Sequence, residues 1–283
     1  MTLRADSTVQ LNNNISIPVI GLGTYLTQNG EEARQAVLWA LEAGYRMIDT
    51  AAVYGNEEGV GAAIAVGGVP REELFVTTKL WNRDHGYEQT LAALDVSLEK
   101  LGMPFVDLYL VHWPSASEER TETINKRKDT WRAMEEICRS GKARSIGVSN
   151  FCVWHLEELL EYADIAPAVN QIEFHPFLYQ RELLKFCTQN RIVVEAYSPL
   201  VKARKMEHDT LMRIAGAYDK SPAQILIRWS LQKGCVTIPK SINRERIIEN
   251  ISVFDFELSD EHMNALDALH ANDRQAWDPT KIR

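Results

Sequence analysis

Long hydrophobic runs are missing from this sequence of 283 residues, since no apolar stretch is long enough to cross a bilayer. The first residues, MTLRADSTVQLNNN, lack the apolar segment of a signal peptide. Cysteine is scarce: the four residues are widely separated and form no CxxC pair, which excludes the usual spacing of a zinc site. We therefore expect a cytoplasmic protein with reduced thiols, no membrane association and no bound metal.

Two further absences concern ligands. The formal net charge is −8 and no long run of lysine and arginine is present, so the electrostatic signature of a nucleic-acid partner is missing. No strand-like run is followed by GxGxxG, because GLGTYL has two glycines without a third, and no phosphate-binding GxxxxGK[ST] occurs. A dinucleotide would therefore have to bind somewhere other than a Rossmann crevice, and small molecules remain the expected ligands.

Alternation of strand-like and helical segments is the main pattern that is present. Short β-branched runs such as LFVTTK, VDLYLVH and IVVEAYS are each followed by helical periodicity. Asn56 is placed to cap one helix, while Gly44 and Gly141 are placed to end two others. Eight such units favour an α/β fold of the (β/α)8 TIM-barrel type over an open doubly wound sheet. No linker divides the chain, so we expect a single barrel domain over residues 1–283.

Two additions to the barrel are expected. The segment TVQLNNNISIP comes before the first unit and predicts a β-hairpin that plugs the barrel bottom. Two helical patterns, TLMRIAGAYD and SPAQILIRWSLQ, both lie between the seventh and eighth strands. They predict two extra helical segments on one side of the barrel.

Chemically active side chains end several of the expected strands, and in this fold all strand ends meet at one face. Asp49 and Lys79 end neighbouring strands and can form an ion pair, which makes burial of both charges acceptable. Tyr54 follows closely and can reach the same lysine. A cation at about 4 Å would lower the pKa of a phenol from about 10 by some three units at most. We therefore expect Tyr54 to be a proton donor near neutral pH.

A carbonyl and a hydride source complete the expected chemistry. His112 ends another strand and can donate a hydrogen bond to a carbonyl oxygen, which Tyr54 would then protonate. Near the end of the chain, IPKSINRERIIEN places Lys240 and Ser241 after a strand and Arg246 in the first turn of a helix. This charge pattern at a helix start suits a ribose 2′-phosphate and so favours NADPH.

These motifs together resemble the aldo-keto reductase family. GLGTY, DTAAVYGNE, TKLW, HWP, GVSNF, NQIEFHP, EAYSPL and IPKSINRERIIEN follow one another from Gly21 to about Asn250. The resemblance is to the small bacterial type, with members like 2,5-diketogluconate reductase and prostaglandin F synthase. It implies a catalytic tetrad of Asp49, Tyr54, Lys79 and His112, with Tyr54 as the general acid. The tail after Leu258 is short, which favours small substrates.

The resemblance also implies the binding residues. Ser149, Asn150 and Gln171 would hold the nicotinamide carboxamide, and Tyr197 would stack on its ring. The full set implied for NADPH or NADP+ is Gly23, Thr24, Tyr25, Asp49, Ser149, Asn150, Gln171, Tyr197, Ser198, Leu200, Lys240, Ser241, Ile242, Arg246, Glu249 and Asn250. The set implied for the substrate is Tyr25, Tyr54, Trp81, His112 and Trp113.

The sequence therefore predicts a monomeric, NADP-dependent oxidoreductase that reduces aldehydes or ketones to alcohols. Two alternatives remain open. One is a barrel hydrolase or lyase that uses Asp49, Glu173 and Glu195 as acid and base, without a dinucleotide. The other is a non-catalytic NADPH-binding sensor or scaffold on the same fold, because a fold does not imply a function.

Overall fold

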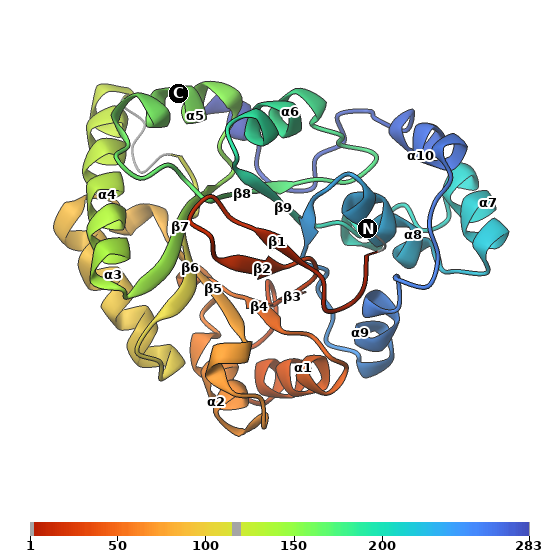
Figure 1. The fold of residues 1–283 in the computed structure, drawn as a ribbon, viewed down its shortest axis with the longest axis horizontal. Helices are drawn as coiled ribbons and strands as arrows, with labels where there is room; N and C mark the ends of the chain where they lie inside the picture. The colour runs from red at the N-terminus through yellow and green to blue at the C-terminus, as the bar shows by residue number, and fades with distance from the viewer. Residues whose placement is uncertain (1–2, 115–119, 283) are drawn as a thin grey trace.

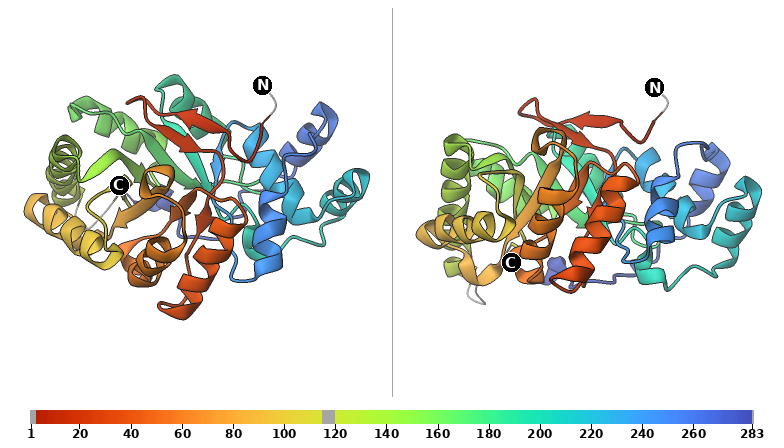
Figure 2. Two further views of the ribbon diagram at one scale, coloured as in Figure 1. Left: turned by 60° about the horizontal axis from the view of Figure 1, so that its bottom comes forward. Right: turned by 90° about the horizontal axis from the view of Figure 1, so that it is seen from below.

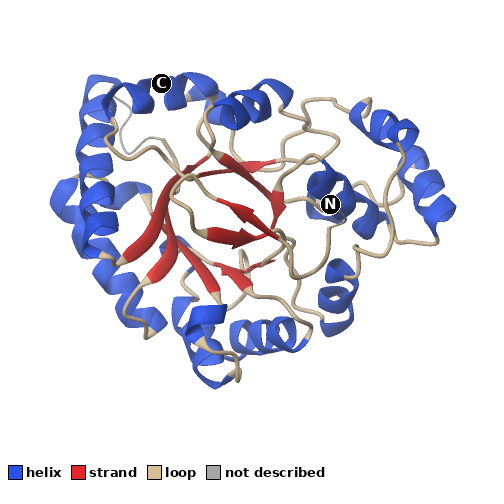
Figure 3. Cartoon of the chain, viewed as in Figure 1, coloured by secondary structure: helices blue, strands red, loops and turns tan. Residues whose placement is uncertain are grey.

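Eight parallel strands form the centre of the protein in the computed structural model, which describes residues 3–114 and 120–282 (Figure 3). They pair in chain order, and parallel bridges from Ile20 to Thr237 and from Gly23 to Lys240 join the first and last strands. The sheet thus closes as predicted. The strands are β3 (Leu22–Gly23), β4 (Met47–Asp49), β5 (Phe75–Leu80), β6 (Val106–Val111), β7 (Ala143–Ser149), β8 (Val169–Glu173), β9 (Val193–Tyr197) and β10 (Val236–Thr237).

Helices surround this barrel, and each strand leads into a helix on the outside (Figure 1). They are α1 (Glu31–Glu42), α2 (Glu57–Val66), α3 (Tyr87–Leu101), α4 (Arg120–Ser140), α5 (Val153–Tyr162), α6 (Arg181–Gln189), α7 (Asp209–Tyr218), α8 (Pro222–Gln232), α9 (Arg244–Ile251) and α10 (Asp260–Asp267). Both α7 and α8 lie between the seventh and eighth strands, as predicted. Helix α10 was not predicted; Ser259 caps its start by accepting a hydrogen bond from the His262 N–H.

The N-terminal hairpin lies across one end of the barrel, and the chain ends near the other (Figure 2). Its strands are β1 (Thr8–Gln10) and β2 (Ser16–Pro18), which pair antiparallel. Asn12 Nδ2 donates to the carbonyl oxygen of Pro167, two residues before β8, and Asn13 Nδ2 donates to the carbonyl oxygen of Arg144, the second residue of β7. The hairpin therefore covers the barrel bottom, as the sequence predicted.

The barrel interior changes from apolar to polar toward the carboxyl ends of the strands. Met47 and Phe75 face each other across β4 and β5 in the lower, apolar part of the interior. Two residues further along each strand, Asp49 is opposite Thr77, and Gln171 on β8 is opposite Glu195 on β9. Because side chains alternate along a strand, these polar residues stand on the same inner face as the apolar residues below them. The mouth of the barrel therefore rests on a buried polar layer.

Two of the three predicted helix-end residues behave as expected, and the third, Asn56, does not. Gly44 and Gly141 adopt φ values of 99° and 80° just after α1 and α4, as predicted for helix-ending glycines. Asn56 precedes α2, but its side chain makes no capping bond. Its Nδ2 donates to the carbonyl oxygens of Thr24 and Thr27 instead. Asn56 therefore ties the loops after β3 and β4 together, which fixes the segment that carries Tyr54.

Candidate active site

Lys79 lies at the centre of a buried cluster at the barrel mouth and is completely inaccessible to solvent. Its Nζ lies 2.6 Å from Asp49 Oδ1, 2.8 Å from the carbonyl oxygen of Thr50 and 3.3 Å from Tyr54 Oη. An ammonium has three N–H groups, and each has an acceptor here. The buried charge is therefore both paired and fully hydrogen-bonded, which is the condition under which such a group is tolerated.

Strand register brings these residues together. Asp49 is opposite Thr77 on the neighbouring strand, so Lys79 stands one inward-facing position further up on β5. Tyr54 ends a short 3-10 helix, η1 (Ala52–Tyr54), and Gly55 follows it with φ of 66°. That left-handed backbone, which glycine adopts without strain, turns the chain into α2 and leaves the phenol over the lysine. The predicted grouping of Asp49, Tyr54 and Lys79 is thus present.

The electrostatics of Tyr54 differ from the prediction. Burial raises the pKa of Tyr54 well above 10, and the nearby carboxylate of Asp49 raises it further. The expected lowering by Lys79 is wrong for this arrangement, because Asp49 lies closer to the lysine than the phenol does and neutralises its charge. The phenol therefore stays protonated across the physiological range, which is the form that a proton donor needs.

His112 follows β6 and borders the same cavity. Its ring meets the rings of Tyr54 and Trp81 edge-on, with centroids 5.6 and 5.3 Å apart. Burial lowers the pKa of His112 well below 6.5, and the charge of Lys79 lowers it further. The imidazole is therefore neutral, and its single N–H can donate to a carbonyl oxygen beside Tyr54.

The residues expected to hold the nicotinamide carboxamide form a continuous network. The Ser149 hydroxyl donates to the carbonyl oxygen of Gln171, and Asn150 Nδ2 donates to Ser149 Oγ and to the carbonyl oxygen of His112. The Tyr197 hydroxyl donates to Asn150 Oδ1 at 2.7 Å. Gln171 uses its NH2 group on two buried carboxyl groups, which leaves its amide oxygen as an acceptor. An acceptor at the cavity suits the NH2 group of a nicotinamide carboxamide.

These residues line one cavity of about 840 Å³. The size suits a small organic ligand, since such sites measure about 300–1,000 Å³. It includes fourteen of the residues that the sequence singled out, namely Gly23, Tyr25, Asp49, Tyr54, Trp81, His112, Trp113, Ser149, Asn150, Gln171, Tyr197, Ser198, Leu200 and Lys240. Three residues of the tetrad, the whole expected substrate set and most of the expected cofactor set therefore line a single space, and Lys79 is buried against Asp49 and Tyr54 in its wall.

Several expected residues lie outside the cavity. Thr24 is buried behind it, with its hydroxyl donating to the carbonyl oxygen of Asp49. The other expected cofactor-binding residues outside the cavity lie between the end of β10 and the end of α9. They are Ser241, Ile242, Arg246, Glu249 and Asn250. Arg246 is exposed in the first turn of α9, whereas Asn250 is buried. Their expected role remains a prediction.

The C-terminal tail supplies a wall that sequence reasoning missed. Trp277 lines the cavity, and its ring centroid lies 5.4 Å from that of Trp113 and 6.1 Å from that of Trp81. The carboxylate of Glu173 accepts hydrogen bonds from the backbone N–H groups of Gln275 and Ala276, at 2.6 and 3.0 Å. These bonds hold the tail over the mouth. A lone tryptophan in a polar tail was the available signal in the sequence.

The contacts of Glu173 and Glu195 bear on the hydrolase alternative. Glu173 is occupied by the tail and by His175, whose Nε2 lies 2.9 Å away, and it does not line the cavity. Glu195 is completely buried below the mouth. Asp49 is thus the only one of the three proposed acids that borders the cavity, and it is paired with Lys79. Among the described residues that line this cavity, Asp49 is the only Asp or Glu, so the cavity holds no pair of carboxyl groups for acid–base hydrolysis.

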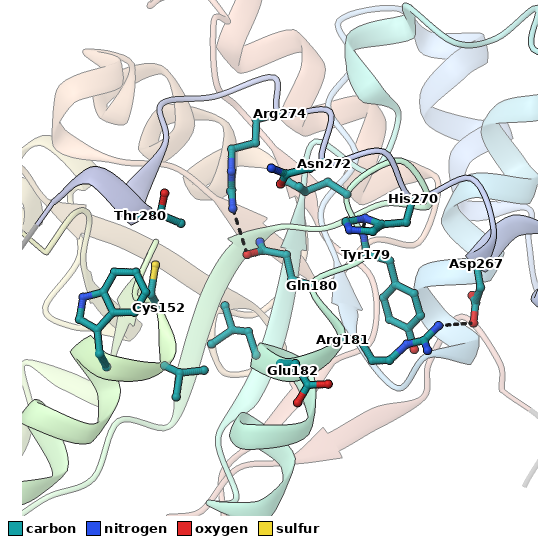
Figure 4. A pocket seen from close by; sticks show the side chains of 14 residues that line it. Cys152, Tyr179, Gln180, Arg181, Glu182, Asp267, His270, Asn272, Arg274 and Thr280 are labelled. Atoms are coloured by element: carbon teal, nitrogen blue, oxygen red, sulfur yellow. Dashed lines mark hydrogen bonds and ion pairs between the residues drawn. The ribbon is translucent and has the colours of Figure 1, made fainter.

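A second cavity, of about 610 Å³, lies between α5, α6 and the C-terminal segment (Figure 4). Its two arginines have partners within the lining: Arg274 donates a hydrogen bond to Gln180 Oε1 at 3.5 Å, and Arg181 lies 4.0 Å from the Asp267 carboxylate. His270 Nδ1 accepts from the Tyr179 N–H. None of the expected site residues contributes to this cavity.

The described residues contain neither a cluster of metal ligands nor a helix suited to a membrane. Within residues 3–114 and 120–282, no three His, Cys, Asp or Glu side chains gather in a way that could hold a metal ion. In the same part of the chain, no helix is both long and apolar enough to span a membrane.

Comparisons with known proteins agree with this geometry. The chain is 52% identical to a glyoxal reductase of Bacillus subtilis over 97% of both chains. It superposes with a TM-score of 0.88 on a Bombyx mori aldo-keto reductase in complex with NADP, at 42% identity and 96% and 95% coverage. It superposes on a Gox0644 mutant in complex with NADPH with a TM-score of 0.91 and 38% identity, covering 99% of this chain and 100% of that chain. The sequence pattern of the Aldo/keto reductase family matches residues 19–271, and the chain therefore belongs to this family of oxidoreductases.

Proposed function

We propose that Asp49, Tyr54, Lys79 and His112 carry out the reduction of a small aldehyde or ketone to an alcohol, with NADPH as the reductant. The chain is an NADP-dependent oxidoreductase of the aldo/keto reductase family. The observation that carries the assignment of residues is the position of Lys79 Nζ, within hydrogen-bonding reach of both Asp49 and the cavity-lining phenol of Tyr54.

Each tetrad residue has a distinct task in this proposal. Tyr54 donates its proton to the carbonyl oxygen, and the neutral His112 orients that oxygen by a hydrogen bond. The nicotinamide, when bound, supplies the hydride. Lys79 stabilises the phenolate that Tyr54 becomes, because a cation 3.3 Å from the oxygen attracts the new negative charge. Asp49 holds Lys79 in place and does not itself transfer the proton.

The proposed cofactor site extends along the barrel mouth, through the cavity and its surroundings. We propose that Gly23, Thr24 and Tyr25 lie beside the nicotinamide, that Ser149, Asn150 and Gln171 bind its carboxamide, and that Tyr197 stacks on its ring. Ser198 and Leu200 would follow the pyrophosphate. The far end of the cofactor would be held by Lys240, Ser241, Ile242, Arg246, Glu249 and Asn250. Lys240 is half-buried at the cavity edge, and its Nζ lies 3.5 Å from the carbonyl oxygen of Leu26 across the mouth.

We propose small, polar carbonyl compounds as substrates. Three tryptophans enclose the space above the tetrad: Trp81, Trp113 and Trp277. Such flat walls favour compact molecules over large, branched ones. The relative from Bacillus subtilis is named a glyoxal reductase, so 2-oxoaldehydes are the first class to test. We also propose that the chain acts as one monomeric domain over residues 1–283 in the cytoplasm, without a nucleic-acid partner.

The proposed reaction is tested by mixing the purified protein with NADPH and glyoxal and following the loss of NADPH. Turnover with NADPH, and slower turnover with NADH at equal concentration, is the expected result. Binding of NADPH without oxidation across a panel of small aldehydes and ketones would support the sensor or scaffold alternative instead. Turnover of an ester or glycoside without any dinucleotide would support the hydrolase alternative.

A further inference from the structure

Glu195 is a buried carboxyl group that the proposed reaction leaves without a role. It stands on the inner face of β9, opposite Gln171 on β8, and it is completely inaccessible to solvent. Its Oε2 accepts a hydrogen bond from Gln171 Nε2 at 3.0 Å, whereas its Oε1 is buried with no hydrogen-bond partner among the described residues. Burying a carboxyl oxygen without a hydrogen-bond partner lowers the stability of the folded protein, so a functional reason for the contact with Gln171 is expected.

The side-chain amide of Gln171 is fixed by two carboxyl groups. Its Nε2 donates to Asp49 Oδ2 at 2.8 Å as well as to Glu195 Oε2 at 3.0 Å, so both N–H bonds of the amide are used. Asp49 is the ion-pair partner of Lys79 and can only accept hydrogen bonds. Turning the amide over would place its oxygen against the Asp49 carboxylate. The amide oxygen is therefore kept free, and Gln171 lines the cavity.

We propose that Glu195 is a positioning residue that acts through Gln171, holding its amide, jointly with Asp49, so that the amide oxygen accepts a hydrogen bond from the nicotinamide carboxamide. This inference rests on the proposed function. Gln171 then links two parts of the site, because its side-chain amide contacts Asp49, which holds Lys79, and would also contact the cofactor. The proton donor and the cofactor are then aligned by one buried network of Lys79, Asp49, Gln171 and Glu195.

The charge state of Glu195 fits this role. Burial raises the pKa of Glu195 to about 8, and the nearby carboxylate of Asp49 raises it further, while Gln171 and Lys79 act in the opposite direction. The group is therefore neutral at pH 7 and adds no second negative charge beside Asp49. The titratable groups that face it are Asp49 from β4, Lys79 from β5 and Tyr54 from η1.

Ionisation of Glu195 at higher pH has a predictable effect. A negative charge on Glu195 raises the pKa of Tyr54, because it disfavours the phenolate. A weaker acid delivers its proton more slowly, so kcat for carbonyl reduction should fall as the pH rises through about 8. Replacing the acid by a neutral amide of the same shape should remove this fall.

Two variants of the full-length protein and one matched control test the proposal. Glu195→Gln keeps an acceptor for Gln171 and cannot ionise, whereas Glu195→Leu offers no acceptor. The control is Thr237→Val, which removes a buried hydroxyl without a hydrogen-bond partner from the neighbouring strand β10 and does not touch Gln171. NADPH affinity is measured by fluorescence titration, and kcat is measured from pH 6 to 10.

Glu195→Gln is expected to bind NADPH within about twofold of the wild type and to keep its kcat above pH 8. Glu195→Leu should bind NADPH about tenfold more weakly, the equivalent of one hydrogen bond, and the control should match the wild type. Wild-type affinity in folded Glu195→Leu would overturn the positioning role. An unchanged alkaline fall in Glu195→Gln would overturn the link to ionisation.

The affinity measurements need no turnover, so they separate this inference from the proposed reaction. A wild-type protein that binds NADPH but reduces no carbonyl would refute the proposed reaction while leaving the comparison of Glu195→Leu with Thr237→Val intact. If Glu195→Leu does not fold, the affinity of Glu195→Gln and its pH profile still decide the matter, because that variant preserves volume and hydrogen bonding. A tenfold loss of affinity in Glu195→Gln would contradict the proposal.

Discussion

Lys79 lies closer to Asp49 than to Tyr54: its Nζ is 2.6 Å from the carboxylate and 3.3 Å from the phenolic oxygen. Lys79 therefore forms its short ion pair with Asp49 and a longer, weaker hydrogen bond with Tyr54. In the resting site the phenol keeps its proton, and when that proton leaves, the lysine is already in place beside the new charge. This ordering of distances lets a carboxylate, an ammonium and a neutral phenol share one buried cluster.

Lys79→Met should lower kcat by about 10²- to 10³-fold, since the developing phenolate loses its cation. It should also destabilise the protein by about 3–5 kcal/mol, because it leaves the Asp49 carboxylate buried and unpaired. The double variant Asp49→Asn, Lys79→Met removes both charges and should recover most of that stability without recovering activity. Urea unfolding and steady-state kinetics measure the two effects. Recovery of activity in the double variant would contradict the account.

Arg246→Ala should weaken NADPH binding by about tenfold or more and leave NADH binding unchanged, since the lost contact is a charge-assisted bond to the 2′-phosphate. Arg244→Ala is the matched control, because its guanidinium lies in the same helix but pairs with Glu42 on α1 at 2.9 Å. Dissociation constants for both cofactors give the comparison. Equal losses for NADPH and NADH would place Arg246 away from the phosphate.

Trp277→Ala should raise KM for glyoxal and other small aldehydes by about three- to tenfold with little change in kcat, because it removes a cavity wall without touching the tetrad. The same variant should accept bulkier aldehydes better than the wild type does. Trp154→Ala removes another exposed tryptophan, from α5 and outside the cavity, and should change neither property. A panel of aldehydes of increasing size, measured with all three proteins, tests this role of the tail.

The free energy of unfolding should fall as the pH rises from 6.5 to 8. The folded protein keeps a proton on Glu195, whose pKa is about 8, while the unfolded chain has lost it above about 4.3. The folded state thus binds more protons in this window, and stability decreases with pH by up to about 1.4 kcal/mol per unit. Urea unfolding of the wild type and of Glu195→Gln should show the slope in the first and its loss in the second.

A pH below 6.5 should destabilise the protein for a different reason. His85 and His155 are buried, and burial lowers the pKa of each to about 4. The unfolded chain takes up two protons on these residues below about 6.5, which outweigh the one proton that the folded state keeps on Glu195, so stability is lost as the pH falls toward 4. Urea unfolding at pH 6.5, 5.5 and 4.5 should show this decrease, and constant stability over that range would contradict it.

Strand-end residues made the core of the site predictable from sequence. Asp49, Lys79 and His112 each end a strand, and the barrel brings such ends together regardless of loop detail. The pKa of Tyr54 was predicted with the wrong sign, because its direction depends on burial and on how completely Asp49 neutralises Lys79. Neither quantity is visible in a sequence.

Features that depend on side-chain contacts between distant segments were not predictable. Trp277 lies at the cavity where Glu173, more than a hundred residues earlier, accepts hydrogen bonds from the backbone just before it. Asn56 was expected to cap α2, yet two carbonyl oxygens from the loop after β3 take its amide instead. Both outcomes follow from tertiary competition for hydrogen bonds, which overrides local preference.

The most direct test of the account is the reduction of glyoxal by Tyr54→Phe, measured together with its affinity for NADPH. We expect kcat to fall by about 10²- to 10⁴-fold with NADPH affinity unchanged, because the variant loses only the donated proton. Tyr162→Phe, which removes a hydroxyl from α5 away from the cavity, should behave as the wild type. Near wild-type reduction by a folded Tyr54→Phe protein that still binds NADPH would contradict the assignment of Tyr54 as the proton donor.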